Sequence, residues 1–143
     1  MIKRIFDFSS SLLGLVILFP LLILISFAIK IGSSGPILFS QKRVGKDGKQ
    51  FILIKFRSML INQQSNNTAT AKGDDRITTI GVFLRKYKLD ELPELWNVLK
   101  GEMSLVGPRP DVPGYADNLK GEDRKILKLR QFKIIRLQII IIR

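Results

Sequence analysis

The sequence contains neither histidine nor cysteine. Without histidine there is no imidazole general base and no Ser-His-Asp triad. Without cysteine there is also no thiol nucleophile, no disulfide and no ordinary zinc site. Any metal must therefore be a hard ion on oxygen ligands, with Mg²⁺ the first candidate, and any catalytic base must be Asp, Glu, Lys or Tyr.

Acidic residues are scarce. The 143 residues include 24 Lys and Arg against 12 Asp and Glu, which gives a net charge of +12. This balance favours polyanionic partners, namely phosphates, nucleic acid or an anionic membrane surface. The basic residues are spread along the chain without a recognition helix, so we expect no nucleic acid partner. The length suits one domain, or one domain with an anchor.

Charge is absent from residues 8–29, a run rich in Leu, Ile, Val and Phe. As a helix this run would measure about 33 Å, enough to cross a bilayer core. A buried soluble helix and a cleaved signal peptide are less favoured alternatives. Basic residues flank both ends, and positive charge prefers the cytoplasmic side. Pro20 marks a bend, so a helix that enters the membrane and returns is slightly favoured over one that spans it.

The rest of the sequence predicts a small cytoplasmic domain of the α/β (α+β) class. Candidate strands at 37–39 and 51–56 flank an Asp-Gly turn, which predicts a β-hairpin. Residues 61–72 lack apolar periodicity and predict a surface loop. Two apolar stripes with helical spacing follow, the second ended by a glycine. The stripes comprise Ile80, Phe83, Leu84 and Tyr87, then Leu89, Leu92, Leu95, Trp96 and Leu99.

Two adjacent carboxylates, Asp90 and Glu91, precede Pro93, which is admissible in the first turn of a helix. The bland interpretation is a solvated helix start, where acidic residues complement the helix dipole. The sharper interpretation is a nucleophile beside a group that handles a metal or a proton. These residues alone do not decide between the two interpretations.

Cations recur around this pair. Arg109 lies between two prolines, whose stiff backbone lowers the entropy cost of presenting a guanidinium to phosphate. Lys55 and Arg57 flank a phenylalanine at a strand end, and Arg85 lies just before the carboxylates. The alternatives are a local turn contact, an exposed strand end and a solvated helix face. Composition and spacing thus indicate a membrane-attached, phosphate-facing basic domain.

Six motifs follow one another in a fixed order along the chain: Lys3-Arg4-Ile5-Phe6-Asp7, residues 35–45, Lys55-Phe56-Arg57-Ser58-Met59, residues 75–78, residues 89–101 and residues 103–110. Each motif alone is modest, but the set in this order is highly specific. The set resembles the bacterial sugar transferase family, the monotopic polyprenyl-phosphate phosphoglycosyl transferases (undecaprenyl-phosphate sugar phosphotransferases). The resemblance runs from residue 1 to about residue 130.

The resemblance implies an enzyme that transfers a phosphosugar from a UDP-sugar to polyprenyl (undecaprenyl) phosphate and releases UMP. Asp90 would be the nucleophile, forming a phosphosugar-aspartyl intermediate, and also a Mg²⁺ ligand. Glu91 would assist proton or metal handling. The transfer would initiate capsule, exopolysaccharide, O-antigen or related lipopolysaccharide assembly. The implied phosphate-binding cations are Arg109, Arg85, Lys55 and Arg57.

The resemblance also implies a location. The catalytic domain would face the cytoplasm at the inner (cytoplasmic) membrane, on a re-entrant helix broken near Pro20. Membrane lipids would be partners, with a homo-oligomer and downstream glycosyltransferases as further candidates. We therefore expect a membrane-embedded segment at 1–34, an incomplete catalytic domain at 35–130 and an atypical tail at 131–143.

The sequence departs from the family pattern after Arg130. Family members usually read Pro-Gly there and continue further, whereas this chain reads Gln131-Phe132-Lys133 and then an aliphatic, basic tail. The tail lacks clean periodicity, which favours a frameshift over an amphipathic membrane segment. A second function therefore stays open, an inactive remnant that only binds polyprenyl phosphate or anionic lipid at the membrane.

Overall fold

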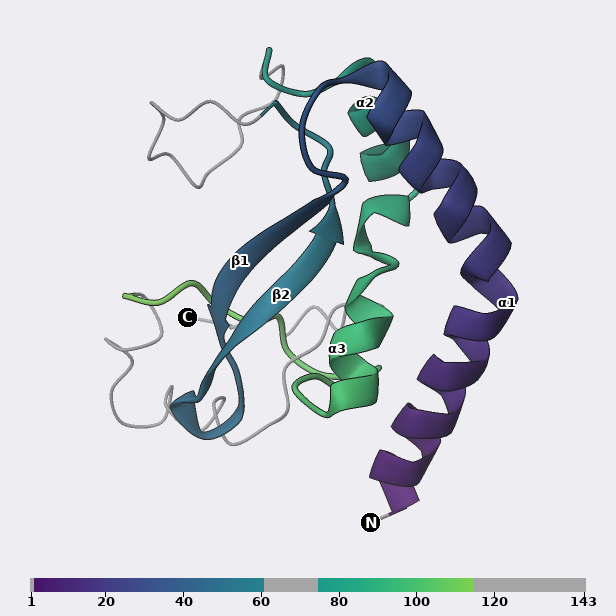
Figure 1. Ribbon diagram of the computed structural model, residues 1–143. Coiled ribbons are helices and arrows are strands. Elements are labelled where there is room, and N and C mark those ends of the chain that lie inside the picture. The colour runs from purple at the N-terminus through teal and green to yellow at the C-terminus, as the bar shows by residue number, and fades with distance from the viewer. Residues whose placement is uncertain (1, 61–74, 115–143) are drawn as a thin grey trace.

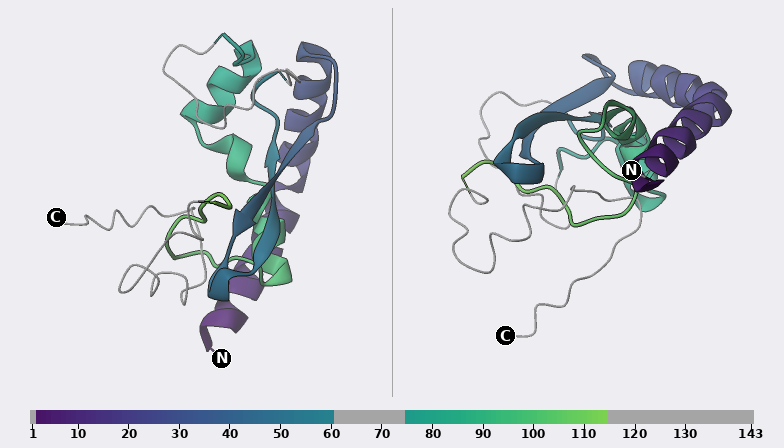
Figure 2. Two further views of the ribbon diagram at one scale, coloured as in Figure 1. Left: turned by 90° about the vertical axis from the view of Figure 1, so that its left-hand side faces the viewer. Right: turned by 90° about the horizontal axis from the view of Figure 1, so that it is seen from below.

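The computed structural model describes residues 2–60 and 75–114. They form three layers (Figures 1 and 2): a long helix, α1 (Ile2–Gly32); then α2 (Thr79–Lys86) and α3 (Glu94–Lys100); then a hairpin of β1 (Leu38–Val44) and β2 (Gln50–Phe56). The predicted α+β class is confirmed. The loop predicted at 61–72 and the tail predicted at 131–143 lie outside the described residues.

The hairpin forms at the predicted Asp-Gly turn. Asp47 and Gly48 lie in a 3-10 turn, η1 (Lys46–Gly48), with φ values of 59° and 75°. The connection between the strands comprises residues 45–49, and hairpin loops longer than two residues commonly place a glycine in this left-handed conformation. All seven residues of β1 pair antiparallel with β2. The first strand is thus longer than the predicted 37–39, because pairing with β2 also recruits the polar residues that follow.

A 3-10 turn connects the two short helices. α2 follows its N-cap Thr78, whose side chain accepts a hydrogen bond from the Gly81 amide at 3.0 Å. The 3-10 turn η2 (Leu89–Glu91) then leads through Pro93 into α3. α3 ends at Gly101, which takes a left-handed conformation with φ 89°. The prediction that the carboxylate pair lies just before a helix is confirmed.

The apolar stripes of these helices are only partly buried. Leu84 and Leu95 face the interior, whereas Phe83, Tyr87 and Trp96 are exposed. The rings of Phe83 and Tyr87 contact each other, with centroids 4.8 Å apart. Each helix is short and packs on one side only, so its buried face is narrower than its apolar stripe.

Two clusters of buried apolar side chains form the core. One joins the hairpin to α3 and the loop after it, through Phe51, Leu53, Val98 and Met103. The other joins the end of β2 to α2 and to the C-terminal part of α1, through Ile25, Ile29, Phe56 and Leu84. α1 therefore contributes directly to the domain core.

Most of α1 outside these contacts is exposed apolar surface. The helix is long and apolar enough to cross a membrane, and only 11% of its most apolar window is buried. Apolar exposure on this scale marks a membrane or partner surface, so α1 is compatible with a membrane-associated protein. The helix continues through Pro20, and Figure 1 shows it bowed around α2 and α3. The expected break at Pro20 is therefore absent, because a helix can accommodate proline by bending.

Asn97 ties β2 to α3. This fully buried side chain accepts a hydrogen bond from the Ile54 amide at 3.2 Å. It also donates to the Ile52 carbonyl and to Glu102 Oε2, both at 2.7 Å. β2 pairs with β1 along one edge, and Asn97 satisfies backbone groups on the other. The side chain thus anchors β2 to α3 immediately beside Lys55.

We predict that Asn97→Ala lowers the free energy of unfolding by roughly 2–4 kcal/mol, because it leaves buried backbone groups without partners. Chemical denaturation of the chain in detergent micelles measures this change. Lys100→Ala, at an exposed position of the same helix, is the matched control and should change the free energy by less than about 0.5 kcal/mol. Equal stability of Asn97→Ala and the wild type would contradict the anchoring role.

Candidate active site

Three carboxylates are buried where η2 meets α3. Asp90, Glu91 and Glu94 are only 8%, 7% and 1% exposed. Removing carboxylates from water is costly unless cations or hydrogen bonds compensate. Their burial excludes the bland interpretation of a solvated helix start.

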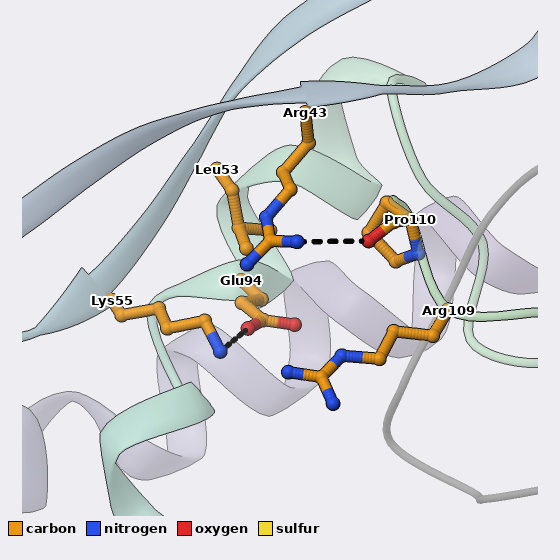
Figure 3. Close-up of a pocket in the computed structure, with 6 residues that line it drawn as sticks. All are labelled: Arg43, Leu53, Lys55, Glu94, Arg109 and Pro110. Atoms are coloured by element: carbon orange, nitrogen blue, oxygen red, sulfur yellow. Dashed lines mark hydrogen bonds and ion pairs between the residues drawn. The ribbon is translucent and has the colours of Figure 1, made fainter. Parts of the chain in front are cut away.

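Lys55 of β2 reaches across to this cluster. Its Nζ lies 3.1 Å from Glu94 Oε1 and 3.6 Å from Glu91 Oε1. Figure 3 shows the Lys55 and Glu94 side chains pointing toward each other from the strand and the helix. The ammonium group is mostly buried, so solvent and salt screen the pairing little. The structure therefore brings Lys55 together with the predicted carboxylates.

Asp90 is less well compensated. Its Oδ1 is buried and has no hydrogen-bond partner among the residues that the structure describes. Burial raises the pKa of Asp90, and the charge of Glu91 raises it further, against the opposing charges of Lys55 and Arg85. Carboxylates perturbed in this way are concentrated at functional sites. Asp90 is therefore the strongest candidate for a nucleophile or a cation ligand.

The carboxylates could hold a metal ion together with a phosphate ligand. In the part of the chain covering residues 2–60 and 75–114, no group of three or more carboxylates converges on one metal position. Mg²⁺, however, commonly binds through one or two carboxylates and the phosphates of a substrate. The unsatisfied Asp90 Oδ1 suits such an arrangement.

Two arginines join the cluster from other elements. Arg109 and Arg43 line a small cleft together with Lys55 and Glu94 (Figure 3). Arg43 Nη1 donates to the Pro110 carbonyl at 3.3 Å, which ties the arginine loop to the hairpin. Burial lowers the pKa of Arg43, and the nearby charge of Arg109 lowers it further. The cleft therefore concentrates positive charge, which suits a phosphate group.

The two remaining predicted cations occupy different places. The charge of Arg85 lowers the pKa of Asp90, so Arg85 lies within electrostatic reach of the carboxylates. Arg57 instead donates to the carbonyls of Ser33 and Ser34 at 2.8 and 2.6 Å. Ser33 and Ser34 directly follow α1, so Arg57 ties the end of β2 to the turn after that helix. Its geometry does not support the predicted contact with substrate phosphate.

Sequence reasoning missed Glu94 and Arg43. Glu94 lies four residues after Asp90, and this helical spacing was a usable signal. Arg43 carried no such signal, because only the packing of β1 against the loop at Pro110 brings it to the cleft.

The fold and the site together define an α+β domain with buried carboxylates beside a cationic cleft, on a long apolar helix that is compatible with membrane association. A family model described as bacterial sugar transferase matches residues 1–135. The chain therefore belongs to the bacterial sugar transferase family.

The names of three curated relatives all describe transferases that act on undecaprenyl phosphate. A Komagataeibacter xylinus protein, undecaprenyl-phosphate glucose phosphotransferase, is 50% identical over 113 residues. A Klebsiella pneumoniae protein, UDP-glucose:undecaprenyl-phosphate glucose-1-phosphate transferase, is 47% identical over 109 residues. A Bacillus subtilis (strain 168) protein named as a candidate undecaprenyl-phosphate N-acetylgalactosaminyl 1-phosphate transferase is 44% identical over 122 residues.

These matches cover most of this chain but differing shares of its relatives. They include 78%, 76% and 85% of this chain, in the order given above. The corresponding shares of the relatives are 21%, 23% and 68%. The chain thus spans about a fifth of two of them and about two thirds of the third.

We predict that Asp90→Asn stabilises the fold at neutral pH. Since the folded state raises the pKa of Asp90 above its ordinary value of 3.8, folded protein binds this proton more tightly than unfolded protein does. The contribution of Asp90 to the free energy of unfolding therefore falls as the pH rises above 3.8. Denaturation at pH 3 and pH 7 should show a gain for the variant that is larger at pH 7.

The exposed hairpin carboxylate supplies the control for this experiment. Asp47 has a side chain that is 58% exposed, so Asp47→Asn should show no comparable gain between the two pH values. A pH dependence of stability that is the same in Asp90→Asn as in the wild type would contradict the argument from burial.

Proposed function

We propose that this chain is part of an enzyme that transfers a sugar 1-phosphate from a UDP-sugar to undecaprenyl phosphate. The observation that carries the proposal is the buried Asp90 with its unsatisfied oxygen, beside a cleft lined by cations. The long apolar helix supports a lipid-linked acceptor at a membrane. The names of the relatives support the same acceptor and the same class of donor.

Asp90 is the proposed nucleophile. Its raised pKa reflects a poorly solvated carboxylate, which is a stronger base and nucleophile once deprotonated. One oxygen attacks the β-phosphorus of the UDP-sugar, the bond from that phosphorus to the bridging oxygen breaks, and UMP leaves with that oxygen. A phosphosugar-aspartyl intermediate remains. An oxygen of undecaprenyl phosphate then attacks the same phosphorus, the bond to Asp90 breaks, and undecaprenyl diphosphate sugar forms.

The surrounding charges have proposed roles in this transfer. Phosphoryl transfer depends mainly on positioning and charge neutralisation. Arg109 and Lys55 would bind and orient the diphosphate, while Glu94 holds the Lys55 ammonium in place. Glu91 is the proposed partner for proton or metal handling. A bound Mg²⁺, held by Asp90 and substrate phosphates, would supply further neutralisation of the diphosphate.

We predict that Asp90→Asn lowers the rate of UMP release by at least about a thousandfold, because an amide cannot serve as the nucleophile. The assay contains the detergent-solubilised chain, Mg²⁺, undecaprenyl phosphate and a panel of UDP-sugars. Asp47→Asn, which removes the same charge at the exposed hairpin turn, should release UMP at the wild-type rate. Release that survives in Asp90→Asn would contradict the proposed nucleophile.

The same assay tests the binding-module alternative. Under that alternative the wild type releases no UMP from any donor, and its binding to vesicles containing undecaprenyl phosphate weakens with salt but is unaffected by Asp90→Asn. This result would contradict the proposed enzyme and support a membrane-attached binding module.

We also propose that α1 enters the membrane and returns to the same face. Near its start, Arg4 donates to the carbonyls of Val98 and Leu99 at 2.6 and 2.7 Å. Near its end, Ile25 and Ile29 belong to the domain core. A helix that crossed the bilayer would carry one end away from the domain and break one of these contacts. The bowed shape of α1 supports a path that keeps both (Figure 1).

We predict that both ends of α1 share the cytoplasmic face. The chain contains no cysteine, so Ile2→Cys and Ile31→Cys, at exposed positions, report their locations individually. In intact spheroplasts neither cysteine should react with a membrane-impermeant maleimide, and both should react after lysis. Lys46→Cys on the domain surface is the control for the cytoplasmic face. Labelling of only one helix end in intact spheroplasts would establish a spanning helix instead.

A further inference from the structure

The start of α1 carries a buried carboxyl group to which the proposed mechanism assigns no role. Asp7 is 2% exposed, although it immediately precedes the uncharged run 8–29. Its Oδ2 accepts a hydrogen bond from Ser104 Oγ at 2.8 Å, and its Oδ1 accepts one from the Leu105 amide at 3.1 Å. A carboxyl group whose two oxygens bind neighbouring residues fixes both the place and the orientation of that segment.

Two basic side chains near Asp7 hold the same region. Lys3 Nζ donates to the Val106 carbonyl at 2.9 Å. Arg4 donates to two carbonyls at the end of α3. A Cβ added to Gly101 would lie 2.9 Å from Arg4 Nη2, so the glycine allows this close approach. The start of α1 therefore holds the chain from the end of α3 to Val106.

This segment leads directly to the arginine of the cleft. Arg109 follows Val106 by three residues, and the prolines on either side of it restrict its backbone. Beyond it, the Pro110 carbonyl accepts from Arg43 at 3.3 Å, and the Asp111 carbonyl accepts from a β1 amide at 2.9 Å. The loop is thus attached to α1 before Arg109 and to β1 after it.

We propose that Asp7 is a positioning residue that acts through Ser104 and Leu105 to hold Arg109 at the diphosphate of a nucleotide donor. The inference rests on the proposed function for the identity of that ligand. The first turns of the membrane helix are then part of the scaffold of the active site. If Asp7 served only in folding, its effect on UDP binding would be independent of the effect of Arg109.

A double-mutant cycle tests this role. The probe is UDP, whose binding to the full chain in detergent micelles is measured by calorimetry. Asp7→Ala and Arg109→Ala should each weaken UDP binding by about tenfold or more. Arg109→Ala removes the charged contact with the diphosphate, and Asp7→Ala removes the hydrogen bonds that place Arg109. The double variant should bind UDP no more weakly than Arg109→Ala alone, since Asp7 acts through Arg109.

Two outcomes of the cycle would overturn the role. If the two single effects multiply in the double variant, Asp7 acts independently of Arg109 and does not position it. If the wild type does not bind UDP, the proposed donor is wrong, and the role of Asp7 toward it is wrong as well. The first outcome leaves the proposed function intact, so the two failures are distinguishable.

Hydrogen exchange supplies a readout that needs no substrate. Asp7→Ala should speed exchange of the Leu105 amide, which loses its acceptor, and unchanged exchange would overturn the contact. Asp7→Asn keeps one acceptor oxygen, so it should restore part of the protection and of the UDP affinity even if Asp7→Ala folds poorly. Asp47→Asn, the exposed matched control, should alter neither quantity.

Discussion

Buried negative charge must be compensated, and in this domain the compensation comes from separate elements. Glu91 and Glu94 lie at the join of η2 and α3, and Lys55 reaches them from β2. Losing one partner would leave the other charge buried and unpaired, which costs several kcal/mol. The hairpin and α3 must therefore keep their relative position, and the buried Asn97 fastens them beside the ion pair.

Asp90 sits in this framework without full compensation, and that is the basis of its proposed reactivity. A well-paired carboxylate would be stable but weakly nucleophilic. The imbalance at Asp90 disfavours its charged form, and a bound cation would relieve it. Stability and function thus place opposing demands on one side chain.

α1 combines two roles that are usually separate. Its exposed apolar surface is suited to lipid, and its buried residues complete the domain core and hold the loop before Arg109. One element therefore offers both a surface suited to lipid and contacts that hold the loop before Arg109. This dual use explains why a helix with an uncharged run of 22 residues carries Lys3, Arg4 and Asp7 at its start: each contacts the domain.

Several features followed from local sequence. The Asp-Gly turn and the Gly101 stop follow from backbone preferences within a few residues, and they predicted the hairpin and the end of α3. The ordered motifs indicated the family, which the family model confirms. The bend expected from Pro20 agrees with the bowed shape of α1, whereas the break implied by the family resemblance is absent, because a helix can accommodate proline by bending.

The sequence by itself determined the long apolar helix, the α+β class, the carboxylate pair and the cations around it. Only the tertiary structure decided which cations belong to the site. Arg57 turned to the end of α1, while Arg43 and Glu94 entered the cleft without having been expected. The physical reason is that burial and charge compensation depend on contacts between residues distant in sequence, as between Asp7 and Ser104. The spacing of apolar residues along the chain does not predict such contacts.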